Sequence, residues 1–260
     1  MFLNKFLGRT HRNYYKWKEN IYKFHYRFKN TCYDELIYKN TVLTTDHLTP
    51  EIKLRLITPE CSLWHANPKE SKFPDDPFWG IYWPGGQALT RFVLDNKNLI
   101  KDKNIIDVGS GCGASAIAAV KSGAEFVLAN DIDIVSLAAI NINSKLNNVE
   151  LFTSNKDLIG KEIDKLNLIE EMYGKHVKWD IILIGDLFYD SDISSKLFLW
   201  FIDLIEKGKT ILIGDPGRHG LNVINEINLK CKLTKLTEYH FQNIEHNGFP
   251  NAGVYKVEKL

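Results

Sequence analysis

The segment from Asn104 to Ser115, NIIDVGSGCGAS, constrains the fold of this chain more than any other. It begins with the β-branched residues Ile105, Ile106 and Val108, which are typical of a buried strand. Three glycines follow at alternate positions, and then a run of small residues that favours a helix. A strand, a glycine loop and a helix in this order let the backbone approach a ligand, with N–H groups of the helix start facing it. The segment therefore predicts an α/β fold with a ligand site at the loop.

The charge beside the loop indicates which ligand it suits. The glycines satisfy the loose dinucleotide pattern GxGxx[G/A], with Ala114 in the last place. However, Asp107 lies two residues before Gly109, where a carboxylate would repel a pyrophosphate in a partly desolvated cleft. The same carboxylate suits a ligand with a positive amino-acid end and a sulfonium. We therefore expect S-adenosylmethionine (SAM) rather than NAD. The alternative is a glycine turn that only packs a helix onto a sheet.

Further apolar runs predict a sheet of seven strands, with five parallel strands and a terminal hairpin whose last strand is antiparallel. The later strands are expected at Phe126–Asp131, Leu151–Thr153, Trp179–Asp190, Thr210–Arg218, Lys232–Phe241 and Gly253–Lys259. Helices are expected at Ile134–Leu146, Ser191–Glu206 and Asn222–Asn228, and residues 158–177 are interpreted as a variable, partly helical insertion.

Two segments before the glycine loop leave alternatives open. Leu48–Pro59 is compatible with a helix starting at Pro50 or with a strand of alternating apolar residues. Pro84 predicts the start of another helix, and Trp79, Tyr82 and Trp83 crowd just before it. These aromatic side chains are interpreted either as core residues or as the cover of a cofactor pocket and of a channel for a cationic substrate.

Aspartates follow or end four of the five parallel strands: Asp107, Asp131, Asp186 and Asp215. Ligands of open α/β sheets bind outside these strand ends, so four acids there suggest a site for cations. A divalent metal is the competing hypothesis, although no metal-ligand histidines accompany the acids. Asp131 lies 22 residues beyond Gly109, a distance suited to a ribose diol, and Asp133 is its competitor. Asn155 and Asp157 suit contacts to an adenine edge or a simple turn.

A lysine amine that accepts a methyl group is a substrate that suits this cluster of acids. A lysine with a pKa of about 10.4 must lose its proton before methyl transfer, which costs about 4 kcal/mol near pH 7.5. An aromatic channel would lower that pKa, and Asp186 or Tyr189 would orient the amine.

Composition places further limits on function. Eight of the 33 basic residues lie in residues 1–33 beside one of the 32 acids, which leaves a net charge of −6 for residues 34–260. The acidic body argues against nucleic acid as the main partner. The four cysteines form no CxxC, and no apolar run is long enough to span a membrane.

The basic residues 1–33 are expected to form an extension, and residues 34–260 one catalytic domain with a lead-in to about residue 75. We interpret residues 1–30 as a mitochondrial transit peptide. A basic tail that contacts a membrane or RNA is the alternative, with a cytoplasmic location.

Several segments together resemble the seven-strand (class I) protein-lysine methyltransferases, from about Leu48 to Arg218. They are PFWGIYWPGGQAL (Pro77–Leu89), DVGSGCGASAIAA (Asp107–Ala119), ANDID (Ala129–Asp133), GDLFYD (Gly185–Asp190) and IGDPGR (Ile213–Arg218). The tryptophan-rich segment and the DxFY pattern are more specific than the glycine loop. The insertion at 158–177 and the C-terminal region depart from the family pattern, which affects the choice of substrate more than the chemistry.

The resemblance implies a Rossmann-like class I SAM-methyltransferase fold and SAM as cofactor. It implies a protein substrate, the beta subunit of electron transfer flavoprotein, and a mitochondrial location. The residues that it places around SAM are Trp83, Gln87, Asp107, Gly109, Ser110, Gly111 and Asp131, with Asp186 shared between cofactor and acceptor. It places Asp186, Phe188 and Tyr189 at the entrance for the lysine, and no metal. Methylation of another protein or a small amine, and an inactive SAM-binding scaffold, are the alternative functions.

Overall fold

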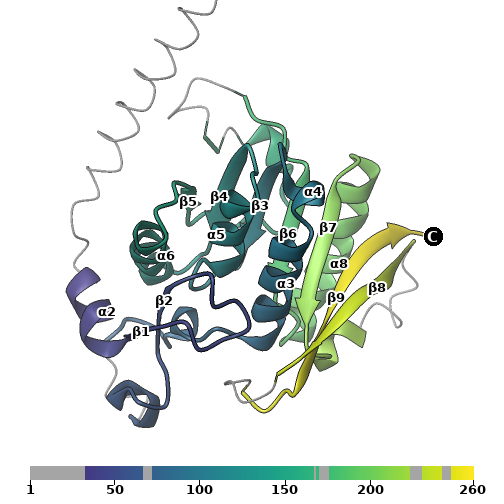
Figure 1. The fold of residues 1–260 in the computed structure, drawn as a ribbon. Helices are drawn as coiled ribbons and strands as arrows, with labels where there is room; N and C mark the ends of the chain where they lie inside the picture. Colours follow the sequence, from purple (N-terminus) through teal and green to yellow (C-terminus); the bar gives the residue numbers. More distant parts are fainter. Residues whose placement is uncertain (1–32, 67–71, 167, 170–175, 223–229, 242–246) are drawn as a thin grey trace, which may run out of the picture.

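The computed structural model describes residues 33–66, 72–166, 168–169, 176–222, 230–241 and 247–260, and within them a seven-stranded sheet forms the centre (Figure 1). Its strand order is β5-β4-β3-β6-β7-β9-β8. The strands are β3 (Asn104–Val108), β4 (Phe126–Asn130), β5 (Phe152–Ser154), β6 (Ile181–Gly185), β7 (Thr210–Asp215), β8 (Cys231–His240) and β9 (Asn251–Lys259). The first five are parallel, and β9 runs antiparallel between β7 and β8. The predicted α/β class, the seven strands and the antiparallel last strand are confirmed.

Helices cover both faces of this sheet. The α-helices are α2 (Asp34–Asn40), α3 (Pro84–Asp95), α4 (Lys97–Ile100), α5 (Ala114–Lys121), α6 (Ile134–Leu146) and α8 (Ser191–Glu206). The short 3-10 helices are η1 (Ser62–His65), η3 (Phe78–Gly80), η4 (Ile163–Lys165) and η5 (His219–Asn222).

Alternate residues of the central strands face two separate cores. Ile105 and Leu183 pack with helices α3 and α5, whereas Ile106 and Ile184 pack with α8. Both faces of β3 and β6 are therefore buried, which explains their nearly continuous apolar sequences. Burial on both faces also fixes the strand register, since a slip by one residue would exchange the two cores.

The lead-in before α3 forms a small sheet and not a helix. β1 (Val42–Thr44) pairs antiparallel with β2 (Leu54–Leu56), which settles the open alternative for the segment around Pro50 in favour of a strand. Asn143 of α6 accepts the backbone N–H of Arg55 at 2.8 Å, and Asn147, which caps the C-terminus of α6, accepts that of Lys53 at 3.0 Å. These hydrogen bonds attach the lead-in to helix α6, which packs on the main sheet.

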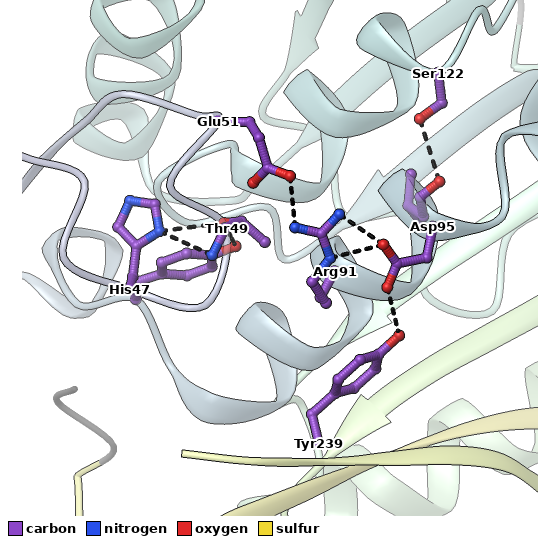
Figure 2. A network of polar contacts seen from close by, with 9 residues as sticks. His47, Thr49, Glu51, Arg91, Asp95, Ser122 and Tyr239 are labelled. Atoms are coloured by element: carbon purple, nitrogen blue, oxygen red, sulfur yellow. Dashed lines mark hydrogen bonds and ion pairs between the residues drawn. The ribbon is translucent and has the colours of Figure 1, made fainter. Parts of the chain in front are cut away.

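A polar network links the lead-in to the C-terminal hairpin through α3 (Figure 2). Arg91 donates to Glu51 at 2.7 Å and to Asp95 at 2.7 and 3.0 Å. Asp95 also accepts the hydroxyl of Tyr239 from β8 at 3.2 Å. The C-terminal half of helix α3 therefore connects the lead-in to the C-terminal hairpin.

The remaining predictions about elements are mostly confirmed. The helices at Ile134–Leu146 and Ser191–Glu206 are correct to the residue, and Asp133 and Asp190 cap their N-termini. The third strand lies one residue later than predicted. The fourth is shorter, because the chain leaves the extended conformation at Asp186, whose φ is +58°. Asn222 ends η5, and the rest of the helix expected at Asn222–Asn228 lies outside the described residues.

The predicted transit peptide, residues 1–30, also lies outside the described residues. Within the described part of the chain, no helix has the length and apolarity needed to cross a membrane.

Candidate active site

The loop between β3 and α5 is held in a conformation that requires glycine. Gly109, Gly111 and Gly113 have φ values of +67°, +52° and +83°, which side chains rarely adopt. A Cβ on Gly109 would lie 2.7 Å from the side chain of Leu187, in the loop after β6. The glycine loop is therefore covered closely by the loop after β6, which brings the carboxyl ends of β3 and β6 together.

Asp107 lies at the floor of this loop. Its carboxylate accepts the hydroxyl of Ser110 and, at 3.2 Å, the backbone N–H of Ala116 in the first turn of α5. Burial raises the pKa of Asp107 to about 7, against the opposing effect of these two hydrogen bonds. Asp107 thus joins both ends of the glycine loop and remains ionisable near neutral pH.

Asp131 follows β4 and bridges two loops at the same edge of the sheet. One carboxylate oxygen accepts the N–H of Gly111 at 2.8 Å, and the other accepts the N–H of Asp133 at 3.0 Å. Asp131 is half-buried, so its carboxylate remains accessible to a ligand. Asp133 instead caps helix α6 by accepting the N–H of Val135 at 2.8 Å. This arrangement favours Asp131 over Asp133 as the group that meets a ribose.

Asn155 and Asp157 follow β5 and are exposed. Asp157 accepts the N–H of Ile159 at 3.1 Å, an Asx turn of the kind considered from the sequence.

The aromatic segment before α3 divides into core and surface. Trp79 and Tyr82 are buried, as in the core interpretation, whereas Trp83 is partly exposed. Gln87 is 2% exposed; its amide donates to the carbonyl of Tyr82 at 2.9 Å and accepts the N–H of Leu48 at 3.0 Å. Gln87 therefore joins the lead-in to the start of α3, and the ring of Trp83 lies beside the guanidinium of Arg218.

Asp186 is the buried acid at the end of β6, and two elements fix its carboxylate. Oδ2 accepts the N–H of Gly86, in the first turn of α3, at 2.7 Å. Oδ1 accepts Nε and Nη2 of Arg218, in the turn after β7, at 3.1 and 2.9 Å. Burial raises the pKa of Asp186 to about 7; the positive charge of Arg218 opposes this shift and the negative charge of Asp215 reinforces it.

Close backbone contacts between glycines bring α3 onto these strand ends. A Cβ on Gly214 would lie 2.0 Å from the carbonyl oxygen of Gly85, and one on Gly185 would lie 3.0 Å from Cα of Gly86. Only glycines permit this approach, and the approach places the N–H of Gly86 on Asp186. The positive end of the α3 dipole therefore favours the ionised carboxylate.

Asp215 was among the predicted strand-end acids, and Arg218, three residues later, is the part of the site that sequence reasoning missed. Asp215 is fully buried; Oδ1 accepts the N–H groups of Gly217 and Arg218 at 2.7 Å each, while Oδ2 has no hydrogen-bond partner. This turn directs the Arg218 side chain back to Asp186. The sequence contained a signal, an arginine shortly after Gly-Asp-Pro-Gly, but the neighbouring acids alone were interpreted.

Phe188 and Tyr189, predicted beside Asp186 as catalytic residues, lie in different environments. Phe188 is completely buried against Phe198 and Phe201 of α8, so it has no surface with which to touch a substrate. Its expected catalytic contact is corrected: its ring anchors the loop after β6. Tyr189 is 55% exposed, and partial burial together with the charges of Asp190 and Asp131 raises its pKa.

The four aspartates, which suggested a site for cations, all have hydrogen-bond partners within the protein. Each accepts at least one backbone N–H, and Asp186 also pairs with an arginine, because strand ends face the N-termini of the following loops and helices. Among the described residues, no group of three or more His, Cys, Asp or Glu side chains is arranged to hold a metal ion.

Comparison with known proteins reveals clear relatives. The chain is 44% identical over 194 residues to the electron transfer flavoprotein beta subunit lysine methyltransferase of Xenopus laevis, covering 74% of this chain and 73% of the relative. It is 39% identical to the Mus musculus protein of that name, over 89% of this chain and 88% of the relative. Residues 88–171 match the family model of ribosomal protein L11 methyltransferase (PrmA).

Among solved structures, SMU.776 complexed with SAH has a TM-score of 0.51 and 15% identity, covering 85% of this chain and 56% of that one. At this level of sequence identity, the likeness shows a similar fold.

Proposed function

This chain belongs to the family of electron transfer flavoprotein beta subunit lysine methyltransferases, and on that premise we propose that it methylates lysine side chains of that subunit with SAM as the methyl donor. The observation that carries the proposal is the buried, doubly fixed Asp186 beside the glycine loop. This residue suits an enzyme that must hold an amine at a defined point. The net charge of −6 in residues 34–260 is compatible with a basic acceptor.

The loop fits SAM better than a dinucleotide. Asn104–Ser115 contains no Lys or Arg to neutralise a pyrophosphate, and it places the carboxylate of Asp107 at its floor. We assign Asp131 to the ribose hydroxyls, because its oxygens are accessible and already oriented by two N–H groups. Asp107, Gly109, Ser110 and Gly111 would hold the methionine end. We call these residues and Asp131 the cofactor side of the site.

Asp186, Asp215 and Arg218, together with the exposed ring of Tyr189, form what we call the acceptor side. SAM bound at the loop supplies a methyl group on a sulfonium, which the amine takes by in-line displacement as the C–S bond breaks. The task of the protein is to position a neutral amine on that line and to exclude water. Oδ2 of Asp186 retains a lone pair beside Gly86 and can accept one N–H of the acceptor, which orients its nitrogen. The proton of the ammonium leaves to solvent before transfer.

The experiment that tests this proposal is Asp186→Asn. Asparagine tolerates the positive φ at this position and can still accept the N–H of Gly86, whereas the negative charge is lost. Its amide NH2 group then faces the guanidinium of Arg218, so urea denaturation of the variant is measured beside its activity. We expect labelled methyl transfer from SAM to the purified flavoprotein beta subunit to fall by about 100-fold or more. S-adenosylhomocysteine binding should stay within about threefold by calorimetry. Normal transfer by the variant would remove Asp186 from the mechanism.

The same assay separates the alternative functions. An enzyme for another protein or a small amine would methylate that acceptor and leave the flavoprotein subunit unlabelled. An inactive scaffold would bind S-adenosylhomocysteine and label nothing. Two features of the proposal rest on sequence alone: the absence of a nucleic-acid partner, from the acidic body, and a mitochondrial matrix location, from residues 1–30. Import of the full chain into isolated mitochondria, against a chain starting at residue 34, tests the location.

A further inference from the structure

Arg218 occupies an enclosed position built from three separate parts of the chain. Its guanidinium lies 5.4 Å from the ring centre of Trp83, before α3, and 5.0 Å from that of Phe249, in the connection between β8 and β9. Two of its nitrogens bind the same oxygen of Asp186, and its side chain is 14% exposed. A guanidinium that contacts two rings and pairs with a buried carboxylate is held in one orientation.

The charges around Asp186 do not balance without an additional cation. Among the described residues, the charged side chains placed against Asp186 are Arg218, which is positive, and Asp215, which is negative. The N-terminus of α3 adds a partial positive charge. Oδ2 of Asp215 is buried and unpartnered, so its charge is only partly offset by the turn that it caps. With both acids ionised, two negative charges face one positive charge, and an acceptor ammonium would complete the balance.

We propose that Arg218 is a positioning residue that holds Asp186 by one oxygen, leaves the other for the acceptor amine, and places a fixed positive charge beside that amine so that it releases its proton more readily. This inference rests on the proposed function and deepens it. A cation next to a second cation disfavours the charged form of the second. Asp186 alone would do the opposite, because a carboxylate retains the proton on the amine.

The sign of the expected pH dependence follows from the net charge. Replacing Arg218 by a neutral residue makes the site more negative by one charge. The proton shared between Asp186 and the acceptor is then held more tightly, whichever group carries it. The acidic limb of the kcat profile reports groups in the enzyme–substrate complex, so it must move to higher pH, by about 1–3 units for charges in contact.

The test compares kcat against pH for the wild type, Arg218→Gln, Arg218→Met and Arg218→Lys, with SAM and the flavoprotein beta subunit. Methionine preserves an apolar stem beside the two rings, and lysine preserves the charge without the two-nitrogen contact. Lys121→Gln, at the exposed C-terminal end of α5 away from the glycine loop, is the control for losing one charge. We expect both neutral variants to shift the acidic limb upward, and the lysine variant and the control to keep it near the wild-type position.

A failure of this inference and a failure of the proposed function give different results. If the neutral variants lose activity at every pH without moving the limb, Arg218 acts through structure alone and the inference is wrong. If the wild type itself transfers no methyl to lysine, the proposed function fails, and no variant is needed to reach that conclusion.

Discussion

The cofactor side and the acceptor side of this site use the same residue types for opposite purposes. On the cofactor side, Gly111 leaves open space: the nearest atom to a Cβ there would be 3.9 Å away. On the acceptor side, glycine removes room, because Gly85 and Gly214 bring the backbones of α3 and β7 into contact. The difference shows that a glycine in a strand-end motif can mark either a ligand cradle or a helix–sheet contact.

The aspartates of the two sides also differ in the hydrogen-bond donors that they accept. Asp107 and Asp131 accept only neutral donors, from a hydroxyl and from backbone N–H groups. Asp186 accepts a backbone N–H and a guanidinium, with a second buried acid nearby. Because the donors to Asp107 and Asp131 are neutral, the negative charge of these residues remains available to a cationic ligand. On the acceptor side, the positive charge of Arg218 already faces Asp186 and affects the protonation of a group that binds next to it.

The largest effect is expected from Gly214→Ala. The new Cβ would collide with a backbone oxygen rather than with a flexible side chain, so helix and strand must separate, at a cost of about 4 kcal/mol or more in the free energy of unfolding. Gly111→Ala is the matched change on the cofactor side, where only the positive φ of +52° opposes a side chain and the cost is about 1–2 kcal/mol. Urea denaturation of both variants measures the difference, and equal losses of stability would refute the contrast between close contact and open space.

A smaller effect, on binding, is expected from Asp131→Ala. Loss of a charged hydrogen-bond acceptor for the ribose is worth about 1.5–3 kcal/mol, or roughly 10- to 150-fold weaker binding of S-adenosylhomocysteine by calorimetry. Asp133→Ala provides the control, because it removes the cap of α6, at about 1 kcal/mol of stability, without touching the assigned ribose site. If the two variants bind equally well, the assignment of Asp131 is wrong.

The smallest effect is expected from Asp215→Asn, and its sign is opposite to that of the neutral Arg218 variants. Asparagine retains the oxygen that accepts from Gly217 and Arg218 but removes a negative charge that raises the pKa of Asp186. The acidic limb of the kcat profile should therefore move to lower pH, by less than about one unit. The shift is small because Asp215 acts on Asp186 only as a nearby charge, whereas the guanidinium of Arg218 contacts Asp186 directly. An upward shift would mean that Asp215 does not act on Asp186 as a like charge.

The local sequence pattern was sufficient to predict the secondary-structure elements and part of the site. The apolar periodicity of Ile134–Leu146 and the capping aspartates before α6 and α8 depend on neighbours a few residues apart, so the sequence determines them directly. The glycine loop with Asp107 and Asp131 was predictable for a related reason: parallel strand ends meet at one edge of the sheet, wherever the strands lie in the chain.

The rest was decided only by the tertiary structure. The pair formed by Asp186 and Arg218 spans 32 residues, and the bond from Gly86 to Asp186 spans 100. The sequence showed Phe188 and Asp186 in one motif, but packing placed the ring in the core and the carboxylate in the site. The strand order and the close glycine contact between α3 and β7 decide which cation meets which acid. A local pattern cannot encode this choice, since it depends on distances between segments that become neighbours only when the sheet forms.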